Sequence, residues 1–80
     1  MPRIWEYKGY KFFFFSNEGE PLKPSHIHVR KEDRLAKFWL VPQVSLANSW
    51  GMNAQELNML QRIVEEHQEE FKERWHDFFG

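Results

Sequence analysis

The stretch PSHIHVRK, residues 24–31, alternates apolar and polar side chains after a proline. Alternation of this kind is typical of a β-strand, whose successive side chains point to opposite faces of a sheet. As a strand, the stretch turns Ile27 and Val29 toward a hydrophobic core. Its other face carries the histidine row, which consists of His26, His28 and Arg30. Two imidazoles and a guanidinium in a row can move protons, hold a metal or bind a phosphate group.

Three other segments have the β-branched and aromatic composition of strands. Lys8-Gly9 predicts a tight turn between the first two strands, and the polar residues 32–34 predict a turn after the histidine strand. Residues 44–50 fit either a short strand or an irregular crossing, and both interpretations remain open. We predict strands over about 3–8, 10–15, 26–31 and 35–41.

Residues 54–79 are predicted to form one long helix. Asn53 suits the N-cap, and Glu56 follows three residues later, as in a capping box. At a rise of about 1.5 Å per residue the helix would be about 40 Å long, so we expect it to overhang the sheet or bend. Its apolar stripe recurs at spacings of three and four residues, at Leu57, Leu60, Val64, His67, Phe71, Trp75 and Phe78.

These elements predict one α+β domain over residues 1–80, an antiparallel sheet of about four strands with the long helix packed on one face. Aromatic residues make up 18% of the chain, so a small core can be built from few positions. So many aromatic side chains in a short chain leave apolar surface outside the core. We therefore expect a homo-oligomer or a small partner protein.

The composition excludes several kinds of protein. The chain has no cysteine, which excludes a disulfide framework and a thiolate metal site. No apolar run approaches the roughly 18 residues that span a membrane, and residues 1–4 do not begin a signal peptide. We expect a soluble cytoplasmic protein that makes no membrane contact.

The net charge of −1 is unevenly distributed along the chain. Residues 1–40 hold eight Lys and Arg against five Asp and Glu, whereas residues 41–80 hold three against seven. The first half is therefore +3 and the second half −4. A basic surface on the strands could attract an anion, but the whole chain lacks the strongly basic balance of a general nucleic-acid-binding protein.

Metal-independent RNA cleavage is the first interpretation of the histidine row. Two imidazoles can act as general base and general acid near neutral pH, and Arg30 with Lys37 or Lys11 can stabilise charge on a phosphate. In a strand, His26 and His28 stand about 6.5–7 Å apart at their Cα atoms, a separation that can bracket a scissile phosphate. This chemistry needs no cofactor.

Two further functional interpretations remain open. A metal site could take two imidazoles from His26 and His28 and further ligands from Glu18, Glu20 or His76, although Arg30 would oppose a cation there. Alternatively, a basic and aromatic sheet face could bind RNA or phosphate without cleavage, provided that the acidic helix covers the other face. The residues for this binding are Lys11, Lys31, Lys37 and Trp39, with stacking also on Phe13.

A structural interpretation competes with all three. Histidines on the solvent face of a strand are ordinary, and they can form hydrogen bonds across the sheet while Ile27 and Val29 fill the core.

Several segments together resemble one family of small bacterial and archaeal proteins, catalogued as domain of unknown function 4160. They are the opening MPxI, residues 9–18 (GYKFFFFSNE), 26–30 (HIHVR), 36–40 (AKFWL) and 75–80 (WHDFFG). The family's His-x-His segment usually follows one or two prolines directly, whereas Pro24-Ser25 precedes it here. The resemblance implies no activity. It does imply a partner protein, since genes of the family often sit beside another small reading frame, as in toxin–antitoxin pairs.

We therefore expect one component of a toxin–antitoxin-like module that binds or cleaves RNA through the histidine row. If the protein is an enzyme, it is a metal-independent ribonuclease with His26, His28 and Arg30 as its catalytic residues. The alternative is a non-catalytic interaction module, antitoxin-like or scaffolding, that binds a partner protein.

Overall fold

The computed structural model describes residues 3–15 and 24–79, which form five strands followed by two helices. The strands are β1 (Arg3–Tyr7), β2 (Tyr10–Phe13), β3 (His26–Lys31), β4 (Arg34–Trp39) and β5 (Ser45–Trp50). The helices are α1 (Ala54–Glu66) and α2 (Gln68–Phe79).

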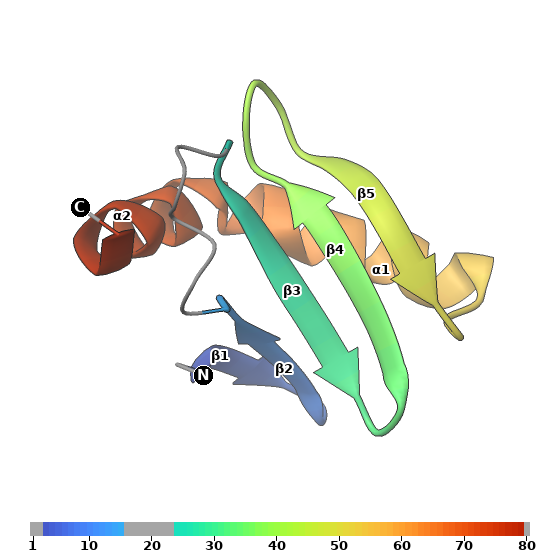
Figure 1. Cartoon of the computed structure of the whole chain (residues 1–80). Helices are drawn as coiled ribbons and strands as arrows, with labels where there is room; N and C mark the ends of the chain where they lie inside the picture. Colours follow the sequence, from blue (N-terminus) through green and yellow to red (C-terminus); the bar gives the residue numbers. More distant parts are fainter. Residues whose placement is uncertain (1–2, 16–23, 80) are drawn as a thin grey trace.

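The strands form one antiparallel sheet in the order β1-β2-β3-β4-β5, and both helices lie on the same side of it (Figure 1). The predicted α+β class is therefore confirmed. The sheet has five strands rather than about four because residues 45–50, left open between a strand and a crossing, pair with β4. β2 is shorter than predicted and ends at Phe13.

Two-residue turns close both predicted hairpins. Lys8 and Gly9 have positive φ angles of 49° and 85°, as the two central residues of a type I′ turn do. Glu32 has a φ of 57° at the first position of the turn between β3 and β4. The hairpin turns therefore have the twist that suits the adjoining strands, even though Lys8 and Glu32, which have positive φ angles, are not glycine.

The helical segment is divided at His67 instead of running unbroken from 54 to 79. The Gln68 side chain donates a hydrogen bond of 3.1 Å to the Glu65 carbonyl at this point. The His67 ring lies 4.6 Å from the Trp5 ring, and Phe71 is buried against Phe12 one turn later. These contacts on β1 and β2 account for the division. Neither helix of the described chain is long and apolar enough to cross a membrane.

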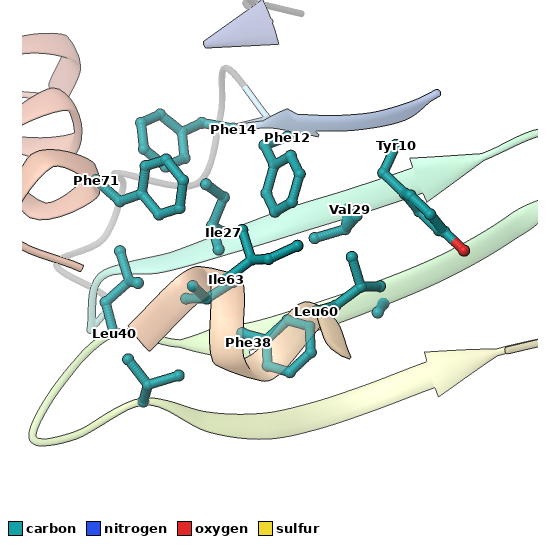
Figure 2. Packing of buried hydrophobic residues seen from close by; sticks show 13 residues of the cluster. Tyr10, Phe12, Phe14, Ile27, Val29, Phe38, Leu40, Leu60, Ile63 and Phe71 are labelled. Carbon is teal, nitrogen blue, oxygen red and sulfur yellow. The ribbon is translucent and has the colours of Figure 1, made fainter. Parts of the chain in front are cut away.

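The core fills the layer between the sheet and the helices (Figure 2). Alternate residues of the strands supply the sheet side, as the period of two predicts, and include Ile27 and Val29 with no exposed surface. The helices add their apolar stripe from the other side. The largest core side chains with at most 1% exposure are Phe12, Phe14, Phe38, Phe71, Ile27, Leu40 and Leu60.

Glu56 connects the start of α1 to the sheet. Its carboxylate accepts hydrogen bonds from the Tyr10 hydroxyl at 2.8 Å and from Arg34 Nη1 at 2.6 Å. It also completes the predicted capping box, because it accepts from the Asn53 amide while the Glu56 amide donates to Asn53 Oδ1. The hydrogen bonds from Tyr10 and from the Asn53 amide lower the pKa of Glu56, and the positive charge of Arg34 lowers it further. Burial and the bond to Glu56 raise the pKa of Tyr10.

Candidate functional site

The face of the sheet opposite the core, which we call the open face, carries the histidine row; at the His26 end, Trp75 of α2 also reaches this row. Strand register places His28 opposite Phe13 on β2 and opposite Lys37 on β4. Lys37 in turn faces Asn48 on β5. An aromatic ring, an imidazole, an ammonium group and an amide therefore stand side by side across four strands.

The neighbouring rows continue this pattern. Toward the start of β3, His26 pairs with Trp39. Toward its end, Arg30 lies between Lys11 on β2 and Leu35 on β4, and Leu35 faces Trp50 on β5. Among the described residues, the open face therefore combines the cationic side chains of Lys11, Arg30 and Lys37 with aromatic side chains from neighbouring strands.

The histidines themselves are buried. His26 has no exposed surface, and its ring lies 5.5 Å from the Trp39 ring and 4.8 Å from the Trp75 ring of α2. Its Nδ1 donates to the Pro24 carbonyl oxygen at 2.9 Å. Histidines on a solvent face, as the structural interpretation supposed, are therefore not what the fold produces.

His28 is 9% exposed and is packed between aromatic rings. Its ring centroid is 5.6 Å from that of Phe13, 4.4 Å from that of Phe15 and 5.3 Å from that of His26. The two imidazoles are thus close neighbours, as the strand spacing predicts. Only His28 reaches the hollow described next, so a ligand on the open face would meet one imidazole and not two.

A hollow of about 410 Å³ opens on this face between β2 and β5. We call it the tryptophan hollow, after Trp50, which is 75% exposed at its rim. The Lys37 Nζ atom lies 4.6 Å from the centre of the Trp39 ring, which holds the ammonium group over the open face. The walls of the hollow include Phe15, His28, Leu35, Lys37, Asn48 and Trp50.

A second hollow, of about 330 Å³, lies at the end of the sheet where the two hairpin turns meet. Lys11 and Arg30 stand directly opposite each other in its wall, and like charges in that position repel. Lys31 also borders it, although its Nζ atom lies 4.6 Å over the ring of Tyr10, a residue of the core. We call this the cationic hollow; its remaining lining residues are Gly9 and Glu32.

The structure separates the predicted binding residues into two groups. Lys37 and Trp39 lie beside the histidines, whereas Lys11 and Lys31 lie with Arg30 at the cationic hollow. Within residues 3–15 and 24–79, no three His, Cys, Asp or Glu side chains converge as a metal site would require. The proposed metal ligands Glu18 and Glu20 fall outside the described residues.

Sequence reasoning missed Phe15, Asn48 and Trp50 as site residues. Asn48 and Trp50 belong to β5, whose pairing with β4 was not predictable from a segment without clear alternation. Gly51 after Trp50 was the available signal, because a glycine at a strand end commonly marks a turn.

The comparisons with known proteins give one result. The family model described as domain of unknown function (DUF4160) matches residues 9–76. No curated protein and no solved structure matches the chain.

Proposed function

Since the chain belongs to the family described as domain of unknown function (DUF4160), we propose its function from the geometry of the open face: the protein binds single-stranded RNA there. The observation that carries the proposal is Trp50, an indole ring 75% exposed at the rim of a hollow that also contains Lys37 and Asn48. A ring that stacks on a base, next to a cation for the phosphate, is the arrangement by which proteins bind single strands.

The charge distribution supports an anionic ligand on this face. Among the described residues its cations are Lys11, Arg30 and Lys37, against one carboxylate, Glu6 of β1, which lies opposite Lys11. The exposed carboxylates of the helices belong to the helix layer behind the sheet, although α2 also reaches the His26 end of the open face through Trp75 (Figure 1). They are Glu65, Glu66, Glu69, Glu70, Glu73 and Asp77.

Each of the two hollows suits a different part of an RNA strand. The tryptophan hollow offers stacking surfaces on Trp50 and Phe15 and polar groups on His28 and Asn48, which suits a base. The cationic hollow offers ammonium and guanidinium groups without an aromatic wall, which suits a phosphate. An RNA strand that lies along the open face passes from one hollow to the other.

Burial of the histidines favours binding over cleavage. A general acid and a general base must both come within hydrogen-bond reach of the reacting atoms. His26 is fully buried among Trp39, Trp75 and His28, so only His28 can approach a ligand in the hollow. We propose that His28 contributes a hydrogen bond to the bound RNA and that His26 supports the ring of His28.

In the cell, we propose that the protein acts in the cytoplasm as the RNA-binding component of a two-component module. A partner protein would then control access to the open face. Induced expression of the chain with and without its neighbouring gene tests this: growth arrest that the neighbour relieves is expected, and equal growth in both cases contradicts the module.

The RNA proposal is tested by titrating fluorescently labelled oligouridine and measuring anisotropy. Because stacking of one base is worth about 1–3 kcal/mol, Trp50→Ala should weaken binding by about 5- to 150-fold. Lys37→Ala should weaken binding and reduce the slope of log K against log salt by about 0.7, the value for one phosphate contact in a single strand. Arg62→Ala, an exposed cation on α1, is the matched control and should bind as the wild type does. Equal affinity in Trp50→Ala and Arg62→Ala would contradict the proposal.

The same samples separate binding from cleavage. Gel electrophoresis after incubation should show intact RNA with the wild type. Cleavage that disappears in a folded His26→Gln/His28→Gln variant would instead make the histidine row catalytic.

A non-catalytic protein-interaction module is the second candidate, favoured by the exposure of Leu46 and Trp50 along the edge of the sheet. Absence of RNA binding at low salt, together with growth arrest that the neighbouring gene relieves, would favour it over RNA binding.

A further inference from the structure

We propose that two copies of this chain associate edge to edge through antiparallel pairing of their β5 strands, forming a closed two-fold dimer with one continuous sheet. The inference rests on the properties of β5 and of the other surfaces, and it does not depend on RNA binding.

β5 is an edge strand with an unprotected sequence. Among the described strands it pairs with β4 alone, so the backbone groups of its other side can pair with another strand. Proteins usually protect such edges with charged residues or proline. Residues 45–50, SLANSW, contain neither. Both large apolar side chains at this edge are exposed, Leu46 by 39% and Trp50 by 75%.

The partner is a second copy because an uncharged strand is compatible with itself. In a two-fold interface the same patch meets itself, so a patch of one charge repels its copy. A two-fold contact through the acidic surface of the helices, or through the cations of the open face, is therefore disfavoured by repulsion between like charges. β1, the other edge, is shorter than β5 and carries the exposed carboxylate of Glu6. The side chains of β5 are all neutral, so two copies of this strand can meet without charge repulsion.

The local irregularity of β5 limits association to a pair. The β4–β5 register shifts between Lys37 and Phe38, so Ala47 is an extra residue on β5. Such a bulge increases the local twist of the strand and disfavours the association of many copies into a long, flat sheet. A short two-fold pairing satisfies the free edge of both copies and leaves no further β5 edge exposed, which closes the assembly.

Dimerisation would extend the open face across the seam, the line along which the two β5 strands pair. Asn48 and Trp50 form the wall of the tryptophan hollow on the β5 side. Pairing through β5 therefore brings the tryptophan hollows of the two copies next to each other, with the cationic hollow of each copy toward the outside. The resulting surface is a single two-fold face with aromatic groups at its centre.

Sedimentation equilibrium of the full chain tests the proposal. The wild type should be a dimer at micromolar concentration, in 0.05 M and in 0.5 M salt alike, because the β5 contact contains no ion pair. Leu46→Lys/Ser49→Lys introduces like charges on the seam and should be monomeric. Gln55→Lys/Asn58→Lys adds the same charge at exposed positions of α1 and should remain dimeric. Circular dichroism confirms that each variant is folded.

Hydrogen exchange on the wild type is a second test of the proposal and needs no variant. Backbone amides of β5 that do not pair with β4 should become protected as the protein concentration rises through the dimerisation range. A monomer at every concentration would overturn the proposal, as would a dimer that persists in Leu46→Lys/Ser49→Lys. Association that salt disperses would also overturn it, since acidic helices would then be contacting the cationic face of another copy.

Discussion

At the scale of single residues, Glu56 holds the first turn of α1 against the sheet through Tyr10 and Arg34. The folded protein lowers the pKa of this carboxyl, chiefly through the hydrogen bond from Tyr10. The contribution of Glu56 to stability is therefore complete above the ordinary glutamate pKa of about 4.3 and is lost as the pH falls through the lowered folded value.

The pH dependence of unfolding checks this contribution. Urea denaturation of the wild type and of Glu56→Gln should show a stability difference near pH 7 that shrinks as the pH falls below about 4. Two curves that stay parallel down to pH 2 would show that the Glu56 carboxylate does not supply the acid sensitivity.

Gly51 is a second residue whose identity the backbone dictates. Its φ is +81°, and an added Cβ would lie 3.2 Å from Arg34 Cγ. Gly51→Ala should therefore lower the free energy of unfolding by about 1–2 kcal/mol for the left-handed backbone, with a further cost for displacing Arg34. Gly9→Ala is the matched control, because its φ is +85° but its nearest neighbour, at 3.4 Å, is the flexible end of Lys31. Equal losses in both variants would exclude the Arg34 contact as a cause.

At the scale of elements, the β1–β2 hairpin contains a residue that does not suit its turn. Lys8 occupies a left-handed position with a φ of 49°, ahead of Gly9. Asparagine adopts this conformation more readily, and Asn-Gly is the preferred type I′ pair. Lys8→Asn should therefore raise the free energy of unfolding by about 0.5 kcal/mol. Thermal denaturation measures the change, and Lys8→Ala should give no gain.

The helices are attached to the sheet by a small number of aromatic side chains. Phe71 is 1% exposed, and its ring lies 5.8 Å from that of Phe12 and 6.2 Å from that of Trp5. Phe71→Ala should cost about 3–5 kcal/mol, a large part of the stability of a small domain. Phe78, 44% exposed on the same helix, is the control, and Phe78→Ala should cost less than about 1 kcal/mol. Denaturant titration compares them, and similar losses would contradict the assignment of Phe71 as the anchor of α2.

At the scale of the whole molecule, the sheet separates a cationic face from an acidic helix layer. The molecule extends 33 × 23 × 19 Å, so charges on opposite faces are separated by more than the Debye length of about 8 Å at 0.15 M salt. Glu66→Gln/Glu73→Gln should therefore leave RNA affinity unchanged at 0.15 M. The same variant should bind more tightly than the wild type at 0.01 M, where the Debye length is about 30 Å. Anisotropy titrations at both salt concentrations make the comparison, and tighter binding at 0.15 M would mean that the carboxylates reach the bound RNA.

Local patterns predicted most of the fold. The alternation around Ile27 and Val29 identified β3, and Asn53 with Glu56 identified the start of α1, because both signals depend on residues close in sequence. β5 was left open since its residues alternate weakly and its partner is another strand. The division at His67 was not predicted, because it reflects the contacts of His67 with Trp5 and of Phe71 with Phe12. These partners stand more than 50 positions earlier in the chain.

The candidate site was predictable in composition but not in arrangement. The period of a strand is enough to place His26, His28 and Arg30 on one face. It does not predict that Trp75, which is 49 positions after His26, would lie against its ring. Nor does it predict that Asn48 and Trp50 would complete a hollow beside Lys37.

The sequence by itself determined the strand periodicity, the helix cap, the turn positions and the family, because each depends on the order of neighbouring residues. Only the tertiary structure decided the register of β5, the burial of the two histidines and the two hollows of the open face. The physical reason is that burial and register depend on which distant segments meet across the sheet, and this is settled by packing of the whole core.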